Sequence, residues 1–244
     1  MLTQSRVPQK LYGAVWAPAA GSLLFEAFCR TFFEVYSPLT VEGRHHLPDE
    51  PFLLCSNHSS HADSAALMTA SGRRFRDFAL LGASDYFFRS SSVRWRVAPL
   101  MNVIPIERRP GPDSLEICLG ECLRFLGQKG KILIMYPEGT RSQNGELREF
   151  KAGVGWFANE LRVPIVPAYI EGTYRILPKG NSIPRPYPIT VRFGEALSPA
   201  VLCGRALSMR EKRRAVAEHL ARQIRSLMQP YAESPQACRA RVER

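Results

Sequence analysis

The sequence predicts an α/β fold with a mostly parallel central sheet flanked by helices and an N-terminal amphipathic, hydrophobic helical segment. Short apolar runs alternate along the chain with longer segments of helical composition, which is typical of parallel strands joined by crossover helices. Two polar stretches, residues 57–64 and 136–142, each follow an apolar run directly, as ligand-binding loops do at the carboxyl ends of such strands. With 45% hydrophobic and 23% charged residues, the 244-residue chain has the composition of a folded protein with one sizeable core.

The first expected element is a phenylalanine-rich helix within residues 11–36. Glu26, Arg30 and Glu34 recur every four residues, so a helix places them on one face. A helix that spans a bilayer needs about 20 mostly apolar residues, and each central charge costs roughly 2.5 to 3.5 kcal/mol. We therefore expect this helix either to dock on its own domain or to lie at a membrane surface, and both interpretations stay open. The N-terminus lacks the small-residue cleavage pattern of a signal peptide, so export is not expected.

The strands are predicted from short apolar runs bounded by turn residues. In chain order they are residues 39–43, 51–56, 77–83, 101–107, 131–137, 163–170 and 188–197. After the first helix, further helices are predicted at residues 62–70, 113–130, 153–162 and 208–231. Gly130 is the expected stop of the helix before the fifth strand, and Ser208 with Glu211 forms a capping box for the last helix. Residues 178–188, rich in proline and glycine, are predicted to form a loop.

The formal net charge of +11, from 33 basic and 22 acidic residues, indicates anionic partners. This charge is compatible with three kinds of partner: nucleic acid, an acidic membrane surface and phosphorylated substrates. The six cysteines lie mostly in apolar stretches without a Cys-x-x-Cys pair, so we expect buried free thiols and a reducing compartment.

The stretch "NHSSHADS", residues 57–64, allows three interpretations. A metal site would need at least three suitable ligands held together, and His58, His61 and Asp63 form no fixed metal signature. Alternatively, Asp63 folds back onto His58, fixes its tautomer and leaves the other ring nitrogen free to accept a hydroxyl proton. In the third interpretation, Asn57, Ser59 or Ser60 merely caps the following helix and the histidines are solvated.

The stretch "YPEGTRS", residues 136–142, has the composition of a phosphate-binding loop. Gly139 lets the backbone approach a ligand, Arg141 offers a forked cation, and Thr140 adds a hydroxyl donor. Glu138 is unusual beside a phosphate, and we expect it to hold the loop through backbone amides or a nearby arginine. An ordinary turn with a surface salt bridge is the alternative.

Four blocks, in order, resemble the 1-acyl-sn-glycerol-3-phosphate acyltransferase family of glycerolipid acyltransferases. "NHSSHAD" resembles the family's Asn-His-x4-Asp block, and "YPEGTRS" resembles its Phe-Pro-Glu-Gly-Thr-Arg-Ser block. "NVIPIERR" and "VPIVPAYI" resemble two weaker blocks, and "FKAGVGWFA" looks like the usual continuation. The likeness extends from about Val41 to Thr173. The chain departs from the pattern at Tyr136, where the family usually has phenylalanine, and at residues 107–109, where it more often has a single acid and arginine.

The resemblance implies a division of roles among these residues. His58 would be the base that deprotonates the acceptor hydroxyl for direct attack on an acyl thioester, and Asp63 would orient it. The residues implied to bind the acceptor phosphate, with two supporting cations, are Glu138, Gly139, Thr140, Arg141, Arg108 and Lys151. No metal and no cofactor is implied. His61 falls on a variable position of the motif, and His45 and His46 are expected in a turn at a strand end.

These expectations describe an O-acyltransferase at a membrane surface. Residues 1–37 would form a membrane-associating helical segment, residues 38–230 the acyltransferase domain, and residues 231–244 a flexible tail. The donor would be acyl-CoA or acyl-carrier protein, and the acceptor a lysophospholipid, most simply 1-acyl-sn-glycerol 3-phosphate. Another lysolipid or a non-phosphorylated hydroxylated lipid is the alternative acceptor, and an anion-binding or nucleic-acid-binding module is a remote alternative. We expect a peripheral or monotopic location at the cytoplasmic face, an anionic membrane surface as partner, and no binding of nucleic acid.

Overall fold

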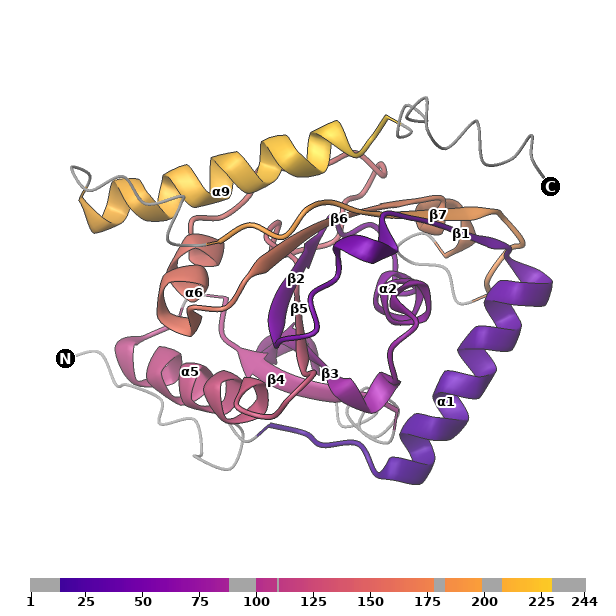
Figure 1. Ribbon diagram of the computed structural model, residues 1–244, viewed down its shortest axis with the longest axis horizontal. Helices are drawn as coiled ribbons and strands as arrows, with labels where there is room; N and C mark the ends of the chain where they lie inside the picture. The colour runs from indigo at the N-terminus through magenta and orange to yellow at the C-terminus, as the bar shows by residue number, and fades with distance from the viewer. Residues whose placement is uncertain (1–13, 88–99, 109, 178–182, 199–207, 230–244) are drawn as a thin grey trace.

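The central element is a seven-stranded sheet with the strand order β1-β7-β6-β2-β5-β3-β4 (Figure 1). The computed structural model describes residues 14–87, 100–108, 110–177, 183–198 and 208–229. All neighbouring strands pair in parallel except β6 and β7, which are antiparallel. The strands are β1 (Leu39–Glu42), β2 (Phe52–Ser56), β3 (Phe78–Ala83), β4 (Asn102–Ile106), β5 (Ile132–Met135), β6 (Ile165–Glu171) and β7 (Ile189–Phe193). The predicted mostly parallel α/β fold is confirmed.

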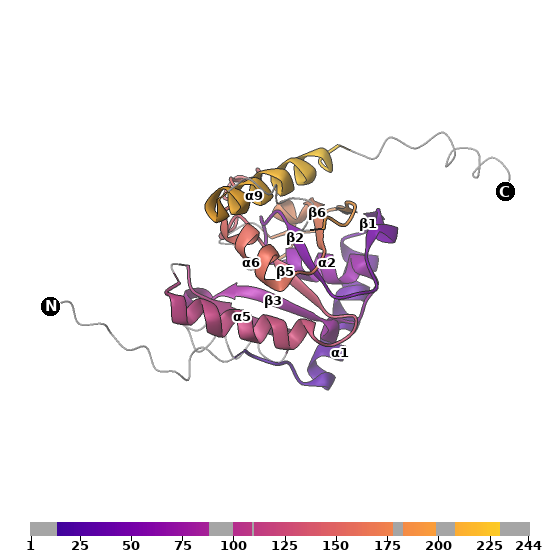
Figure 2. The same ribbon diagram turned by 60° about the vertical axis from the view of Figure 1, so that its left-hand side comes forward.

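Helices cover both faces of this sheet because its central strands are apolar on both sides. In β2, Phe52 and Leu54 belong to one core cluster, whereas Leu53 and Cys55 belong to the other. The first cluster lies under α1 (Ala19–Thr31) and α2 (Asp63–Ser71). The second lies under α5 (Pro112–Leu126), α6 (Gly153–Leu161) and α9 (Met209–Ser226). In both ribbon views α9 and α1 lie at opposite ends of the molecule (Figure 2).

The N-terminal helix packs on its own domain through a polar contact. Arg30 pairs with Glu26 at 2.9 Å and also donates to the Arg73 carbonyl, while Glu26 accepts the Phe75 backbone N–H. After Thr31 the helix widens into a π-helical turn, Phe32–Tyr36, which interrupts the four-residue repeat before Glu34. The structure therefore shows α1 docked on its own domain, while contact of this segment with a membrane surface stays a prediction. Within the described residues, no helix combines the length and the apolar character needed to cross a membrane.

Two kinds of element differ from the sequence prediction. Helix α5 ends at Leu126, with Gly127 as its cap, so Gly130 is not its stop. Gly130 instead takes a positive φ of 71° in the turn that leads to β5. Four short helices were not predicted, because each is too short to show a helical period: Arg44–His46, Phe75–Asp77, α3 (Ser84–Phe87) and α7 (Thr173–Ile176). The predicted flexible tail and residues 178–182 of the proline-rich loop lie outside the described residues.

Helix α9 begins as predicted. The Ser208 side chain accepts the Glu211 N–H, and the Glu211 carboxylate accepts the Ser208 N–H in return, which completes the capping box. Its apolar stripe is buried against the sheet and α6, and consists of Val216, Ala217, Leu220, Ala221 and Ile224. The first turns of α9 can approach α6 closely because residue 155 is glycine. A Cβ there would lie 2.2 Å from the Arg213 carbonyl oxygen.

Candidate active site

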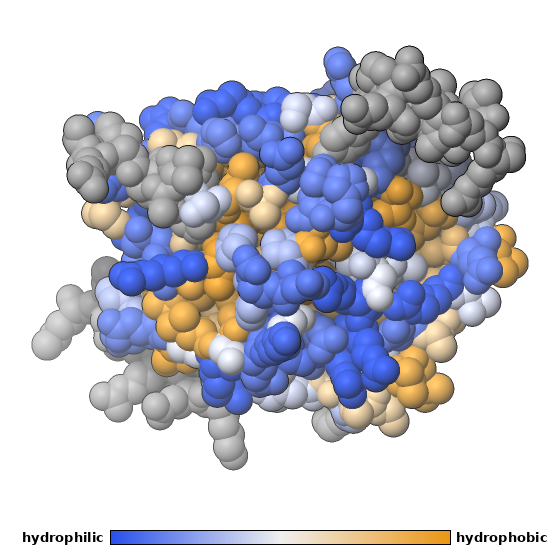
Figure 3. Space-filling view, viewed as in Figure 1, coloured by the Kyte–Doolittle hydropathy of each residue, from blue (hydrophilic) through white to orange (hydrophobic). Residues whose placement is uncertain are grey.

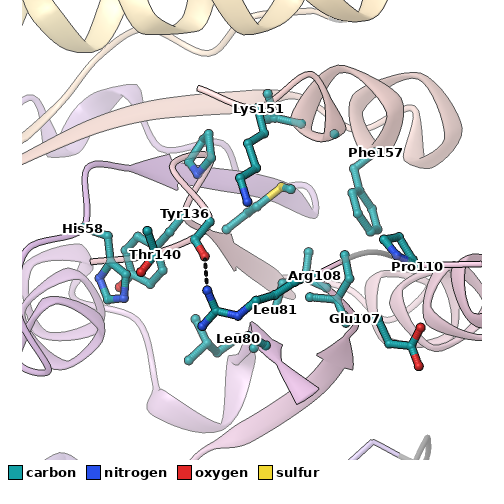
Figure 4. Close-up of a pocket in the computed structure, with 18 of the residues that line it drawn as sticks. His58, Leu80, Leu81, Glu107, Arg108, Pro110, Tyr136, Thr140, Lys151 and Phe157 are labelled. Atoms are coloured by element: carbon teal, nitrogen blue, oxygen red, sulfur yellow. Dashed lines mark hydrogen bonds between the residues drawn. The ribbon is translucent and has the colours of Figure 1, made fainter. Parts of the chain in front are cut away.

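The two predicted loops meet at one edge of the sheet. They leave the carboxyl ends of β2 and β5, which are parallel neighbours, so their first residues lie side by side. A cavity of about 830 Å³ opens there, lined by residues of both loops (Figure 4). His58 stands at one end of the cavity in the view of Figure 4, and Phe157 and Pro110 stand at the other.

His58 is paired with Asp63, the first residue of α2. The Nδ1 atom of His58 lies 2.8 Å from Asp63 Oδ2, and the same oxygen accepts the backbone N–H groups of Ser59 and Ser60 at 2.7 and 2.8 Å. Because an ionised carboxylate only accepts hydrogen bonds, Nδ1 carries the proton and Nε2 has a free lone pair. Asp63 is buried, so the imidazole is oriented by a side chain that is itself fixed.

The structure contradicts the interpretation in which Asn57, Ser59 or Ser60 caps helix α2. Ala62 precedes α2, and no side chain caps the helix. Asn57 instead turns toward β6, where its side chain exchanges two hydrogen bonds with the backbone of Ile170. The amide of Asn57 thus anchors the loop to the neighbouring strand, while the Asp63 carboxylate closes the turn from inside.

Tyr136 is a site residue whose part the sequence did not reveal. Its ring stacks on His58 with centroids 3.9 Å apart and an interplanar angle of 11°. Its hydroxyl is 2.8 Å from the Ser64 Oγ, which neighbours Asp63 on α2. Burial raises the pKa of Tyr136 well above its usual value, so the hydroxyl remains protonated. The only available indication was the tyrosine in place of the family's phenylalanine.

Glu138 holds the two loops together from beneath. Its carboxylate accepts the backbone N–H of His58 at 2.7 Å and that of Arg148 at 3.1 Å. The Glu138 side chain is buried and does not line the cavity. It holds the loop through backbone amides, which was one of the two arrangements expected from the sequence. Burial raises the pKa of Glu138 to about 7, although these two hydrogen bonds oppose the rise. A further bond runs from the Ser142 N–H to the His58 carbonyl at 2.7 Å.

The remaining predicted residues line the cavity. Gly139 has a φ of 68°, and a Cβ there would lie 2.7 Å from the Nζ of Lys151, which rests over it. Arg108 pairs with Asp85 at 2.8 Å and donates to the Gly139 carbonyl at 3.4 Å, a bond drawn in Figure 4. Thr140 and Arg141 complete the set. The structure thus gathers the three predicted cations, Arg108, Arg141 and Lys151, around the cavity. Of the predicted site residues, only Asp63 and Glu138 do not line it.

His61 also lines the cavity, although the motif gave it no role. Its burial lowers its pKa to about 4, helped by the positive charge of Arg141. At neutral pH it is therefore uncharged.

In the part of the chain that the structure describes, no group of three or more His, Cys, Asp or Glu residues is arranged to hold a metal ion.

The cavity has an apolar wall and a second group of cations that sequence reasoning missed. The apolar residues come from β3, from β4 and the residue before it, from β5 and from α6, and include Leu80, Leu81, Met101, Ile106, Met135, Trp156 and Phe157. The second group consists of Arg210 and Arg213 on α9. Nothing local distinguishes these two from the other arginines of that basic helix.

The arrangement combines an imidazole with a free acceptor nitrogen, several cations and an apolar wall. It is suited to removing a proton from a hydroxyl group while an anionic, partly hydrophobic molecule is held beside it.

The chain is similar to known acyltransferases. The family model described as Acyltransferase matches residues 38–171. A chloroplastic 1-acyl-sn-glycerol-3-phosphate acyltransferase of Arabidopsis thaliana is 32% identical over 173 residues, which cover 65% of this chain and 46% of that protein. The human 1-acyl-sn-glycerol-3-phosphate acyltransferase alpha is 32% identical over 131 residues, covering 52% of this chain and 43% of that one.

The chain spans about half the length of the curated relatives it matches. Among solved structures, the 1-acyl-sn-glycerophosphate acyltransferase PlsC from Thermotoga maritima superposes with a TM-score of 0.60. That alignment covers 86% of this chain and 81% of the other at 24% identity, and it supports the fold alone. Since the family model covers more than half of the chain and includes both loops of the cavity, this protein belongs to the acyltransferase family.

Proposed function

We propose that this protein transfers a fatty acyl group from a thioester donor to the free hydroxyl of a lysophospholipid, most simply 1-acyl-sn-glycerol 3-phosphate. The observation that carries the proposal is the contact of His58 with Asp63 at 2.8 Å beside a loop that supplies Thr140 and Arg141 to the same cavity. The names of the relatives from Arabidopsis thaliana and Homo sapiens favour this acceptor.

In the proposed reaction, His58 Nε2 takes the proton of the acceptor hydroxyl as its oxygen attacks the thioester carbonyl carbon. The new carbon–oxygen bond forms, the carbon–sulfur bond breaks, and the imidazolium returns the proton to the departing thiolate. The negative charge of Asp63 stabilises the imidazolium during the transfer. General-base assistance of this kind contributes about 10²- to 10⁴-fold in rate, which suits an already activated thioester.

The acceptor's phosphate would bind where the loop presents Gly139, Thr140 and Arg141. Gly139 keeps the backbone open to a ligand, and the guanidinium matches phosphate oxygens in geometry. Lys151 and Arg108 would add positive charge at the same place, while Glu138 would act through the backbone of His58. The proposed chemistry needs no metal and no cofactor, because the donor, acyl-CoA or acyl-carrier protein, is a substrate.

The experiment that tests this activity uses labelled acyl-CoA and micellar lysophosphatidate with mass analysis of the lipid product. The wild-type protein should form phosphatidate, and His58→Gln should lower kcat by at least about a hundredfold. His45→Gln, an exposed histidine on another surface, serves as the matched control and should retain full activity. Activity of His58→Gln within threefold of wild type would refute the proposed base.

The acceptor's identity is tested by replacing lysophosphatidate with a neutral lysolipid. If the guanidinium binds the phosphate, Arg141→Ala should lower kcat/KM for lysophosphatidate by about ten- to a hundredfold and leave a neutral acceptor unaffected. A wild-type preference for the neutral acceptor would favour the alternative of a non-phosphorylated lipid. We expect no specific binding of DNA or RNA, only salt-sensitive attraction.

We further propose that the protein acts at the cytoplasmic face of a membrane as a peripheral or monotopic protein. Helix α1 directs its charged pair, Glu26 and Arg30, toward the domain and leaves apolar side chains outside. Leu23, Leu24 and Phe28 are 65%, 72% and 64% exposed. In Figure 3 hydrophobic surface appears along the lower right edge, where Figure 1 has α1. This apolar face and the net charge of +11 together suit an anionic membrane surface.

A further inference from the structure

The cavity extends over the edge of the sheet from one helical layer to the other. At one end are His58 and Ser64, which belong to the layer of α2. Trp156 on α6 and two arginines on α9, Arg210 and Arg213, also line the cavity and belong to the layer on the opposite face of the sheet. Because α2 and α9 pack on opposite faces of the sheet, the two ends of the cavity are separated by the strand ends themselves.

The two arginines are held in place by the packing of α9 on α6. A Cβ on Gly155 would lie 2.2 Å from the Arg213 carbonyl oxygen and 2.6 Å from its Cα, so backbone rests on backbone there. Arg210 is one turn earlier on the same side of the helix, and both side chains line the cavity. Figure 1 shows these first turns of α9 lying over α6.

The Nε atom of Arg213 lacks a hydrogen-bond acceptor within the described part of the chain. The atom is also buried. A buried donor without an acceptor costs free energy, and its lack of a partner shows that no carboxylate of the described residues holds this guanidinium through Nε. By contrast, Arg214 on the same helix pairs with Glu218 at 2.8 Å and does not line the cavity. The two cavity arginines are thus distinct from the general basic surface of α9.

The proposed acceptor cannot supply the anion for this end of the cavity while it reacts. In 1-acylglycerol 3-phosphate the phosphate is carried by the carbon next to the one that bears the reacting hydroxyl. Its phosphate must therefore stay close to His58, beside the loop of Gly139 to Arg141, which is tied to His58 through the Ser142 N–H at 2.7 Å. The other reactant, the thioester, has its phosphate at the far end of a long pantetheine arm.

We propose that Arg210 and Arg213 bind the phosphate at the end of the pantetheine arm of the acyl-thioester donor, with Trp156 and Pro110 along the arm. This inference rests on the proposed acyl transfer and adds the donor's subsite to it. Both acyl-CoA and acyl-carrier protein contain this phosphate. The reacting hydroxyl and the donor's phosphate then approach the cavity from opposite faces of the sheet, so the two reactants do not compete for one set of cations.

The test compares Arg210→Gln/Arg213→Gln with Arg222→Gln/Arg225→Gln in the full chain. The control removes the same charge from the same helix with the same spacing, at exposed positions that do not line the cavity. Circular dichroism and thermal melts establish that both variants are folded. Three measurements follow: calorimetric binding of coenzyme A, KM for each substrate, and turnover with an acyl N-acetylcysteamine thioester, which carries no phosphate.

We expect the cavity variant to bind coenzyme A about ten- to a hundredfold more weakly and to raise KM for acyl-CoA by a similar factor. Its KM for lysophosphatidate should change less than twofold. The ratio of wild-type to variant rate should fall toward one with the phosphate-free donor. The control should behave as wild type in all three measurements.

Several outcomes would overturn the inference. An equal loss with both donors would assign the arginines a structural part. In a further sedimentation assay with anionic vesicles, a loss of vesicle binding with coenzyme A affinity retained would assign the arginines to a membrane headgroup. If the wild-type protein transfers no acyl group from any donor, the proposed function fails. The coenzyme A titration still decides about the arginines in that case, since unchanged affinity in the variant refutes the subsite.

Discussion

His58 is restrained by three groups, one from its own loop and two from the loop of residues 136–142. Asp63 holds its Nδ1, the Tyr136 ring covers one face, and the Glu138 carboxylate accepts its backbone N–H. Each partner is itself bonded to another group, so the ring has little freedom to rotate. A base that is already oriented loses less entropy on reaching the transition state, which is why such support contributes to rate as well as to stability.

Tyr136 should contribute through its ring and its hydroxyl separately. Tyr136→Phe keeps the stack but leaves the Ser64 hydroxyl without its partner, so we expect a loss of about 1 to 3 kcal/mol in unfolding free energy and a small change in kcat. Tyr136→Leu removes the stack and should also lower kcat by about 2- to 12-fold. Denaturant unfolding and steady-state kinetics measure the two effects. Equal kcat in both variants would show that the stack does not position His58.

Glu138 should make stability depend on pH in a defined direction. Its pKa is raised from 4.5 to about 7 in the folded protein, so between these values the folded state holds a proton that the unfolded state has released. The contribution of Glu138 is complete below about pH 4.5 and is lost as pH rises through 7. Relative to Glu138→Gln, the wild type should thus lose roughly 1 to 3 kcal/mol between pH 5 and pH 8. Parallel unfolding curves for the two proteins across this range would contradict the raised pKa.

At the scale of elements, α1 packs Phe25 and Cys29 on the core beside its ion pair and leaves a second apolar face exposed. Its ion pair faces the domain, whereas Leu24 and Phe28 face outward. An exposed stripe of large apolar side chains on a helix this short is expected where another apolar phase covers it. Glu26 and Arg30 pair with each other and with the backbone of the domain. Their charges are therefore compatible with membrane contact on the opposite face of the helix.

The outward face of α1 should determine vesicle binding. Leu24→Glu/Phe28→Glu removes two side chains that each contribute roughly 1.5 to 3 kcal/mol when buried, so sedimentation with anionic vesicles should fall by at least about tenfold. Ile117→Glu/Leu123→Glu on α5, also exposed apolar positions, is the matched control. Activity on micellar substrate should survive the α1 change. Vesicle binding equal to that of wild type would remove α1 as the membrane contact.

At the scale of the whole molecule, the sheet includes one reversal that holds its outer part together. Strand β7 runs antiparallel to β6 and parallel to β1, so the first strand joins the sheet through the last. Arg192 on β7 is buried and pairs with Glu42 on β1 at 3.1 Å and Glu171 on β6 at 3.0 Å. Such a buried cation needs both partners to offset its loss of hydration. It therefore favours this one strand order over alternatives.

The buried thiols give a direct measure of global unfolding. Four cysteines are buried and free in the described residues, as predicted, while Cys203 and Cys238 lie outside them. Burial raises the pKa of Cys29 to about 12 and that of Cys55 further, so little thiolate is available for alkylation. Peptide mapping after iodoacetamide at pH 8 should find the four thiols at least about a thousandfold slower to react than in denaturant. Rapid labelling of Cys55 in the native protein would contradict this core.

Local patterns were sufficient for most elements and for the residues nearest the chemistry. Buried strands and long helices have a period that can be recognised in sequence, and the capping box of Ser208 and Glu211 is a contact between near neighbours. His58 and Asp63 were predicted as a pair because they are five residues apart in one turn. The helix end at Leu126 and the short helix Thr173–Ile176 were missed, because one or two turns carry too little periodicity.

The sequence by itself determined the α/β class, the two loops at strand ends and the chemical character of their side chains, because these follow from short-range periodicity and residue type. Only the tertiary structure decided which face of α1 points outward, that Tyr136 covers His58, and that Arg210 and Arg213 reach the same cavity. These contacts join segments tens of residues apart. They depend on how helices and strands pack into close-fitting layers, and that packing is a property of the whole chain rather than of any segment within it.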